Sequence, residues 1–330
     1  MADGVKRLAA GIATALSALL AAADARAAES SQYPSRPIRL IVPGPAGGAP
    51  DLNARIVQPM LGELLGQPIV VDNRPGAGGM IGTELAARAV PDGYTLLWGG
   101  PGSLTIQPHL HKRLTFDPAK DFVPVSLVAM SPMLLLVNPS IPARSVAELV
   151  SLARSQPDKL NYASFGVGNV NHLAMEQLKG MSGAKLTHVS YNGSPPALNA
   201  LLGGYVQVLF ASPPSTIDHV RAGRLRALGV SSMKRLPLAP EIPTLSESGL
   251  ADFQSGAWSA LLAPAKTPGG IVAVLSTAVV KTVGSPKVRA QLEGQGTEPV
   301  GSSPADLAAF MRAESDKHAK IVKAAGIKVD

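Results

Sequence analysis

Short apolar runs alternate with helical patterns along most of the chain. The first run, Ile38–Val42, predicts a strand. A Pro/Gly loop follows at 43–49, and a helix is predicted from Pro50, because proline suits the first helical position and Asp51 falls in the first turn, where the helix dipole favours a negative charge. Apolar residues recur every four positions in this helix, which predicts that they form its buried face: Leu52, Ile56, Met60 and Leu64.

The same alternation predicts the fold class. Further strands are predicted at 69–72, 94–98, 123–129, 133–137, 160–163, 187–190, 205–210, 225–230 and 256–262, and further helices at 79–90, 145–154, 170–181, 194–203, 214–222, 269–282, 286–293 and 303–324. Strands that alternate with helices favour an α/β fold with mostly parallel sheets covered by helices. A length of 330 residues is enough for two domains. The break in the apolar run at 131–132 predicts the first crossing between them.

The N-terminal 27 residues have the pattern of a cleaved signal peptide. Lys6 and Arg7 form a positive region, an apolar run covers 8–23, and Ala25-Arg26-Ala27 is a small-residue cleavage site. The alternative is a membrane anchor, but the apolar run is shorter than the roughly 20 residues that a membrane-spanning helix needs. We therefore expect an exported protein that is soluble after cleavage.

Composition narrows the chemistry. The chain has no cysteine, which excludes disulfides and thiolate catalysis. The formal net charge is +7, but Lys and Arg are scattered without interleaved aromatic residues, which argues against nucleic-acid binding. The positive balance is explained either by a solvated basic surface or by mild steering of anionic ligands.

Gly-rich loops are the main candidates for a binding site. Loops at 43–49, 76–79, 164–169 and 191–194 join predicted strands to helices, and a fifth loop at 99–103 follows a strand. A turn requirement explains any one of these loops more simply than a ligand does. Together, in both halves of the chain, they predict a shared cleft in which unpaired N–H groups, those of 47–48 and 166–168 above all, bind one small carboxylate.

Other side chains give weaker signals. His109 and His111 lack a convincing third metal ligand. His172 could donate to a carboxylate, but a capping or buried role is as consistent with its place in the first turn of a helix. Ser103 and Ser164 lack the nucleophile elbow of hydrolases, and the sequence shows no general base paired with them by spacing. We expect no catalysis, no metal and no cofactor, since the glycine run at 76–82 only approximates a dinucleotide fingerprint. Tyr191 is either a cleft wall or a core residue.

The chain shares many short motifs with a known family, in one order from residue 33 to the C-terminus, and their order and number make the resemblance specific. The matching segments are Tyr33-Pro-Ser-Arg-Pro-Ile-Arg-Leu-Ile-Val-Pro43, Pro45-Ala-Gly-Gly48 with Asp51, Asn73-Arg-Pro-Gly-Ala-Gly-Gly-Met-Ile-Gly82, Pro91-Asp-Gly-Tyr-Thr-Leu-Leu97, Asp121-Phe-Val-Pro-Val125, Ser164-x-Gly-x-Gly168 with His172, Leu225-Arg-Ala-Leu228, Ile242-Pro-Thr244, Ala263-Pro-Ala265 and Ala325-Gly-Ile-Lys328. The chain resembles the Bug/TctC family, the periplasmic solute receptors of tripartite tricarboxylate transporters.

The resemblance implies a two-domain periplasmic-binding-protein (Venus-flytrap) fold with the ligand between the domains. It implies domain 1 at 28–131 plus 255–300, and domain 2 at 132–254 plus 301–330. It also implies a small carboxylate ligand, membrane permease subunits as partners, and a monomer in the periplasm. The loops and the resemblance together give these candidate ligand-binding residues: Pro45, Ala46, Gly47, Gly48, Asp51, Gly78, Gly79, Gly102, Ser103, Ser164, Gly166, Gly168, Asn169, His172, Tyr191, Asn192 and Gly193.

Departures from the family pattern concern the ligand more than the fold. Gly44 stands where many members have Phe, Asn169 replaces a usual Ser, and Asn192 replaces a usual Lys. We therefore expect a ligand that differs in size or polarity from amino acids and tricarboxylates. Two alternatives stay open: an orphan receptor that reports its ligand to a signalling partner, and an extracytoplasmic hydrolase.

Overall fold

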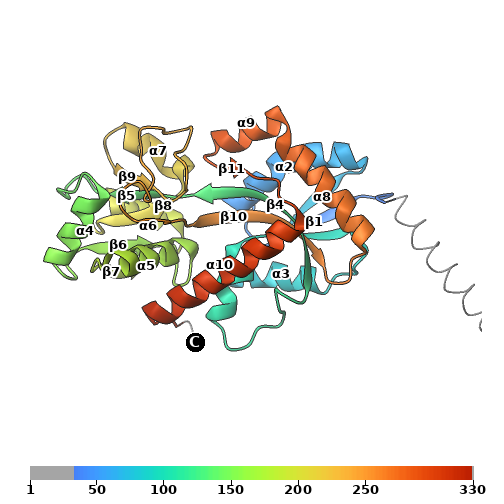
Figure 1. The fold of residues 1–330 in the computed structure, drawn as a ribbon, viewed down its shortest axis with the longest axis horizontal. Coiled ribbons are helices and arrows are strands. Elements are labelled where there is room, and N and C mark those ends of the chain that lie inside the picture. The colour runs from blue at the N-terminus through green and yellow to red at the C-terminus, as the bar shows by residue number, and fades with distance from the viewer. Residues whose placement is uncertain (1–32, 329–330) are drawn as a thin grey trace, which may run out of the picture.

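The computed structural model describes residues 33–328, which form two α/β lobes, each built on its own sheet (Figure 1). The predicted signal peptide lies outside the described residues. Lobe 1 contains a six-stranded sheet in the order β11-β4-β10-β3-β1-β2, and lobe 2 a five-stranded sheet in the order β7-β6-β8-β5-β9. Four strands of each sheet run in one direction, while β10 and β11 oppose them in lobe 1 and β5 in lobe 2. The predicted fold class is confirmed.

The elements follow the predicted order, with shifted ends. Lobe 1 contains β1 (Ile38–Val42), α2 (Ala49–Leu65), β2 (Ile69–Asn73), α3 (Met80–Ala87), β3 (Thr95–Gly99), β4 (Phe122–Pro132), β10 (Gly256–Pro264), α8 (Gly269–Gly284), α9 (Pro286–Gly294) and β11 (Glu298–Pro299). Lobe 2 contains β5 (Leu134–Val137), α4 (Val146–Ser155), β6 (Asn161–Ser164), α5 (Val170–Ser182), β7 (Thr187–Ser190), α6 (Ser194–Leu202), β8 (Val208–Ala211), α7 (Pro213–Arg221) and β9 (Arg226–Val230). The loop predicted at 99–103 runs into a π-helical turn, η2 (Gly102–Ile106), and then a 3₁₀ turn, η3 (Gln107–His109).

The predicted buried face of α2 is only partly correct, because Ile56 and Met60 are half-buried against the lobe 1 core but Leu52 and Leu64 are exposed. The side chains that pack into the lobe 1 core are Ala54, Val57, Leu61 and Leu65, whereas Leu52 and Leu64 are 43% and 46% exposed. A row spaced by four residues turns about 40° around a 3.6-residue helix at each step. After three steps it has therefore left the face on which it began, while the observed spacings of three and four stay on one side.

The two lobes are joined by strands that cross between them. The chain passes from β4 into β5 at Met133 and returns at Ser255 into β10. Ser231, fully buried after β9, contacts both crossings: its hydroxyl accepts from the Met133 N–H (2.8 Å) and donates to the Ser255 carbonyl (2.5 Å). Its own backbone pairs with Met133 and Ser255 as well. One residue therefore connects both crossing segments.

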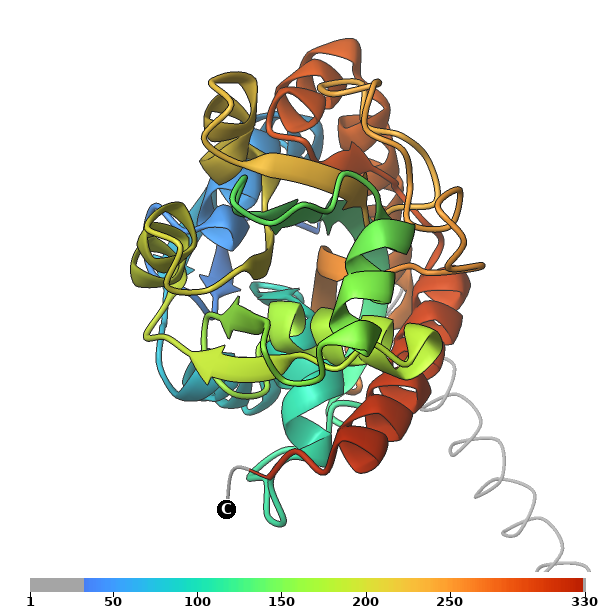
Figure 2. The same cartoon turned by 90° about the vertical axis from the view of Figure 1, so that its left-hand side faces the viewer.

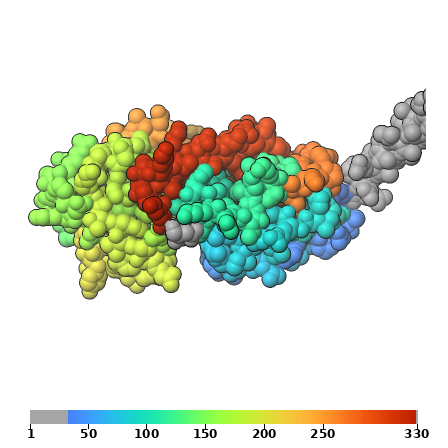
Figure 3. Space-filling model, turned by 90° about the horizontal axis from the view of Figure 1, so that it is seen from below, coloured from blue at the N-terminus to red at the C-terminus, as the bar shows by residue number. Residues whose placement is uncertain are grey.

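A long C-terminal helix, α10 (Pro304–Ala325), lies across both lobes. It packs on β4 and η2 of lobe 1 and on α5 of lobe 2. Figure 2 shows it, in red, beside the green helices of lobe 2. Figure 3 shows the same helix bridging the lobes, with an indentation between them. The domain boundaries given above, including the placing of 301–330 in domain 2, stay a prediction.

Residues 33–328 contain no single helix that is long and apolar enough to cross a membrane. Among the described helices, only α8 and α9 taken together reach that length and composition, and they are bent by 69° with respect to each other.

Candidate functional site

The loop between β1 and α2 is organised by the buried carboxylate of Asp51. This carboxylate accepts hydrogen bonds from the Gly47 N–H (2.8 Å), the Asn73 side-chain amide (3.0 Å) and the Arg55 guanidinium (2.9 Å). Burial alone would raise the pKa of Asp51, but these hydrogen bonds outweigh it and hold the pKa below its ordinary value. Asp51 is therefore ionised at neutral pH, and its role is to fix the loop.

This arrangement corrects the expectation that the amides of 47–48 are unpaired. The Gly47 N–H is used by Asp51, and the Gly48 N–H donates to the Pro45 carbonyl (3.1 Å). The N–H groups of Ala49 and Asp51, in the first turn of α2, donate no hydrogen bond within the described chain. The Asp51 carboxylate already lies at this positive helix end, so a ligand anion gains less there. Pro45 and Ala46 are exposed on the same loop.

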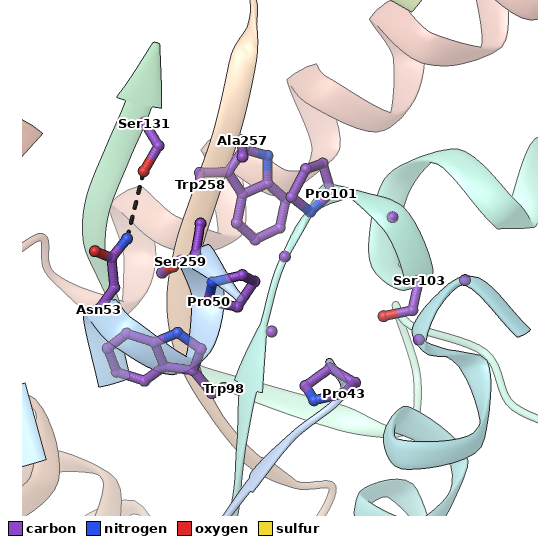
Figure 4. Close-up of a pocket in the computed structure, with 16 residues that line it drawn as sticks. Pro43, Pro50, Asn53, Trp98, Pro101, Ser103, Ser131, Ala257, Trp258 and Ser259 are labelled. Carbon is purple, nitrogen blue, oxygen red and sulfur yellow. Dashed lines mark hydrogen bonds between the residues drawn. The ribbon is translucent and has the colours of Figure 1, made fainter. Parts of the chain in front are cut away.

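A recess of about 170 Å³ opens in lobe 1 where β1 and β3 end, and Figure 4 shows its walls. The predicted residues Gly78, Gly79, Gly102 and Ser103 line it. Gly79 has φ +92, and a Cβ there would lie 3.1 Å from the Pro43 carbonyl, so a side chain at this position is strained and crowded. Ser103 is buried, and its hydroxyl lies 2.6 Å from that of Thr83.

Most of the recess lining was missed by the sequence analysis. The walls include Trp98 of β3 and Trp258 of β10, together with Pro43, Pro50 and Pro101. The polar side chains Asn53, Ser131 and Ser259 also line it, and Asn53 donates to Ser131 (3.4 Å). Trp98 packs in one hydrophobic cluster of lobe 1 and Trp258 in another, yet both line the recess, which no local motif reveals.

Two histidines hold the loop between β6 and α5 of lobe 2 in place. The buried Ser164 hydroxyl lies 2.6 Å from His188 Nε2 and donates to the Gly166 carbonyl (3.1 Å). The Gly168 N–H donates to His172 Nδ1 (3.0 Å). The two imidazole rings stack with centroids 3.9 Å apart. Each histidine therefore anchors one end of the loop.

These contacts correct a second expectation about free amides. The Gly168 N–H is taken by His172, the Gly166 N–H contacts the Ser164 hydroxyl (3.3 Å), and the Asn169 N–H donates to the Gly166 carbonyl. His172 accepts from its own loop and is buried, which matches the alternative of a buried histidine.

The unpaired donors of lobe 2 lie in the first turn of α5. Asn169 precedes this helix without capping it through its side chain. The N–H groups of Val170, Asn171 and His172 donate no hydrogen bond within the described chain. The first turn contains no acidic residue, in contrast to α2. The helix dipole is thus uncompensated at this end, which favours a bound anion.

The Tyr191–Gly193 turn lies next to this loop because β6 and β7 are adjacent parallel strands. The Tyr191 N–H donates to the Ser164 carbonyl (3.0 Å), and the Gly193 N–H donates to the Tyr191 carbonyl (3.0 Å). Tyr191 is half-buried against the lobe 2 core, and Asn192 is exposed. The structure thus brings the predicted lobe 2 residues together, without any cationic side chain among them.

The Ser164–His188 contact could not be found from spacing along the chain. The parallel register pairs Ser164 with Ser190 and Tyr162 with His188, which places the two side chains together across neighbouring strands. Ser164 is fully buried and its hydroxyl is used within the loop, so the pair holds the loop in place. The other predicted histidine of interest, His109, contacts Ser315 of α10 (2.9 Å).

The buried histidines predict a loss of stability in acid. Burial and the neighbouring His188 lower the pKa of His172 to about 4, with Lys179 acting in the same direction and Glu176 opposing. His172 takes up a proton below about pH 6.5 in the unfolded chain but only near pH 4 in the folded chain. The stability of the fold is therefore complete above pH 6.5 and falls as the pH drops from 6.5 to 4. At about 1.4 kcal/mol per unit, His172 accounts for about 3 kcal/mol.

Urea unfolding of the wild type and of His172→Gln at pH 7 and at pH 4 measures this contribution. We expect the wild type to lose about 2–3 kcal/mol more than the variant, because the glutamine oxygen accepts from Gly168 without titrating. Equal losses in the two proteins would show that His172 is not responsible.

Comparisons with known proteins show which family the chain is similar to. The sequence-family model described as tripartite tricarboxylate transporter family receptor matches residues 53–327. Protein BugT of Bordetella pertussis is 35% identical over 298 residues, which cover 90% of this chain and 91% of BugT. Two solved structures from Rhodopseudomonas palustris are also similar. Rpa4515 with adipate is 37% identical with a TM-score of 0.78, covering 90% of this chain and 99% of that one. MatC (Rpa3494) with bound malate is 34% identical with a TM-score of 0.73, and the match covers 88% of this chain and 100% of MatC.

Proposed function

The chain belongs to the tripartite tricarboxylate transporter receptor family, and from this premise we propose that it captures a small carboxylate between its lobes and delivers it to a transporter permease. The family consists of solute-binding receptors, and the chain is a receptor of this kind rather than an enzyme. Export by the N-terminal signal peptide and a periplasmic location are part of the same proposal.

One observation supports the proposal most strongly: the uncapped first turn of α5, which presents three N–H groups beside the 164–169 loop. Charge-assisted hydrogen bonds from backbone N–H groups bind a carboxylate without any cationic side chain. The relatives bound to adipate and to malate add support, since both ligands are small carboxylates. Contacts from both lobes with one guest favour the closed form, which the permease then recognises.

Thermal unfolding in the presence of carboxylates tests the proposal. A ligand present at 100 times its dissociation constant is expected to stabilise the protein by about 2.7 kcal/mol. The series comprises acetate, hexanoate, benzoate, malate, adipate and citrate. The control is the matching uncharged amide of each acid, which lacks the charge that the α5 amides recognise. If the amides stabilise as strongly as the acids, or if no acid stabilises, the carboxylate assignment is wrong.

A further inference from the structure

His172 and Gly168 are joined by a hydrogen bond that only a neutral histidine can make. The Gly168 N–H donates to Nδ1 of His172 (3.0 Å), and both residues are buried. A backbone N–H is always a donor, so Nδ1 must present a lone pair and carry no proton. A protonated imidazole has an N–H at both ring nitrogens, so two donors would face each other in a buried space. Proton uptake by His172 is therefore incompatible with this position of the loop.

His188 lies beside His172, but its own contact tolerates a charge. Ser164 has one hydroxyl proton, which it donates to the Gly166 carbonyl (3.1 Å), so His188 donates from Nε2 to the hydroxyl oxygen (2.6 Å). Nε2 keeps its hydrogen when the ring gains a second proton at Nδ1. Of the two stacked histidines, only His172 loses its hydrogen bond on protonation.

The surroundings of His172 do not favour its charged form. Burial lowers its pKa most, and His188 and Lys179 act in the same direction. Glu176 opposes them, but its carboxylate already accepts from the Tyr162 hydroxyl (2.5 Å) and from Lys179 (2.6 Å). The strands β8 and β10, which also pack on α5, contain no titratable residue, and α10 meets this region through apolar side chains. These contacts hold the pKa of His172 at about 4.

The loop that this hydrogen bond holds also contacts lobe 1. Gly168 has φ +73, and a Cβ built on it would collide with the side chain of Leu110, which follows η3. Leu110 belongs to an apolar cluster that both lobes share, with Ile106 of η2 and Leu173 of α5. Movement of the loop therefore disturbs a contact between the lobes.

We propose that His172 is a proton-sensitive switch: when it is protonated, the 164–169 loop leaves both the hydrogen bond to His172 and its place against Leu110, while the rest of the fold persists. In the open loop His172 meets water and its pKa returns to the ordinary value of 6.5, so acid favours the open form. With a pKa of about 4 in the closed loop, the ratio of open to closed loops rises about 50-fold from pH 7 to pH 4.5. The switch goes beyond the proposed function and does not depend on it, because it operates in the ligand-free protein.

Amide hydrogen exchange of the ligand-free protein, read by NMR between pH 7 and pH 4.5, measures the loop opening. The protection factor of the Gly168 N–H should fall about 50-fold in the wild type. It should fall less than fivefold in His172→Gln, whose side-chain oxygen accepts the same N–H without titrating. The Leu178 amide, in the buried middle of α5, reports global unfolding and should stay at least tenfold better protected than Gly168.

Three results would overturn the switch. The first is a Gly168 protection factor that does not change with pH in the wild type. The second is an equal fall in His172→Gln, which would assign the effect to another group. The third is equal protection of Gly168 and Leu178 at each pH, which would mean that the loop opens only when the whole protein unfolds.

Two further variants separate the proton sensor from the contact with lobe 1. His188→Gln removes the neighbouring histidine and should keep a fall of at least tenfold, because the contact of His188 does not depend on its charge. Leu110→Ala removes the lobe 1 side chain and should lower the protection of Gly168 at every pH while the pH dependence remains. Loss of the pH dependence in His188→Gln overturns the role of His172. Unchanged protection in Leu110→Ala overturns the contact with lobe 1.

Discussion

Replacing Val170 by proline is expected to weaken carboxylate binding by about 10- to 100-fold while the protein stays folded. Val170 is the first residue of α5, and its N–H has no partner in the described chain, so proline removes one donor to the ligand and no hydrogen bond of the fold. A hydrogen bond to a charged group contributes about 1.5–3 kcal/mol. Proline is favoured at the first helical position, and the preceding Asn169 has φ −73 and ψ 158, the extended conformation that a following proline requires.

Gly269→Pro is the matched control for this variant. Gly269 is the first residue of α8 in lobe 1, its N–H is also unpaired within the described chain, and it does not line the recess. Calorimetric titration with the tightest-binding acid should show the loss only in the Val170 variant. Normal affinity in a folded Val170→Pro protein would contradict the role given to the α5 amides.

The second large effect is expected at Ser231. The substitution Ser231→Ala removes the hydroxyl and leaves the Met133 N–H and the Ser255 carbonyl without that partner in the buried crossing region. Each unsatisfied buried group costs about 1–3 kcal/mol, so we expect the free energy of unfolding to fall by about 2–5 kcal/mol. Both crossings pass this residue, so their relative position should be held less firmly, through the backbone pairs of Ser231 that alanine keeps.

Urea unfolding measures the first effect and small-angle scattering of the ligand-free protein the second. Ser276→Ala is the control, because Ser276 is buried in α8 and its hydroxyl makes no hydrogen bond within the described residues. It should change stability by less than about 0.5 kcal/mol. A Ser231→Ala protein as stable as this control would show that the crossing is held by other contacts.

The fold was largely predictable because its signals are local. Strand runs such as Ile38–Val42 and capped helices such as the one that Ser145 opens are encoded within a few residues, and the structure has both. The face of α2 was not predictable from a four-residue spacing, because that row drifts around the helix. The buried side depends on which residues of β1 and α8 the helix meets, and this is a tertiary contact.

The position of the candidate loops in the fold was predictable, but the hydrogen bonds of their N–H groups were not. The Gly-rich loops were expected at the carboxyl ends of the strands, and Gly79 and Ser103 line a recess there. Which amides are free depends on side chains from elsewhere: Asp51 takes the Gly47 N–H and His172 the Gly168 N–H. The indole walls come from strands more than 150 residues apart in the sequence, so no motif could join them.

A crystal structure with the tightest-binding acid of the series tests the central claim most directly. The claim is that the α5 amides hold one carboxylate while lobe 1 contacts the rest of the guest. We expect a carboxylate oxygen about 3 Å from the N–H nitrogen of Val170, Asn171 or His172, with the rest of the guest in contact with lobe 1. A guest bound elsewhere, with those three amides facing water, would contradict the claim.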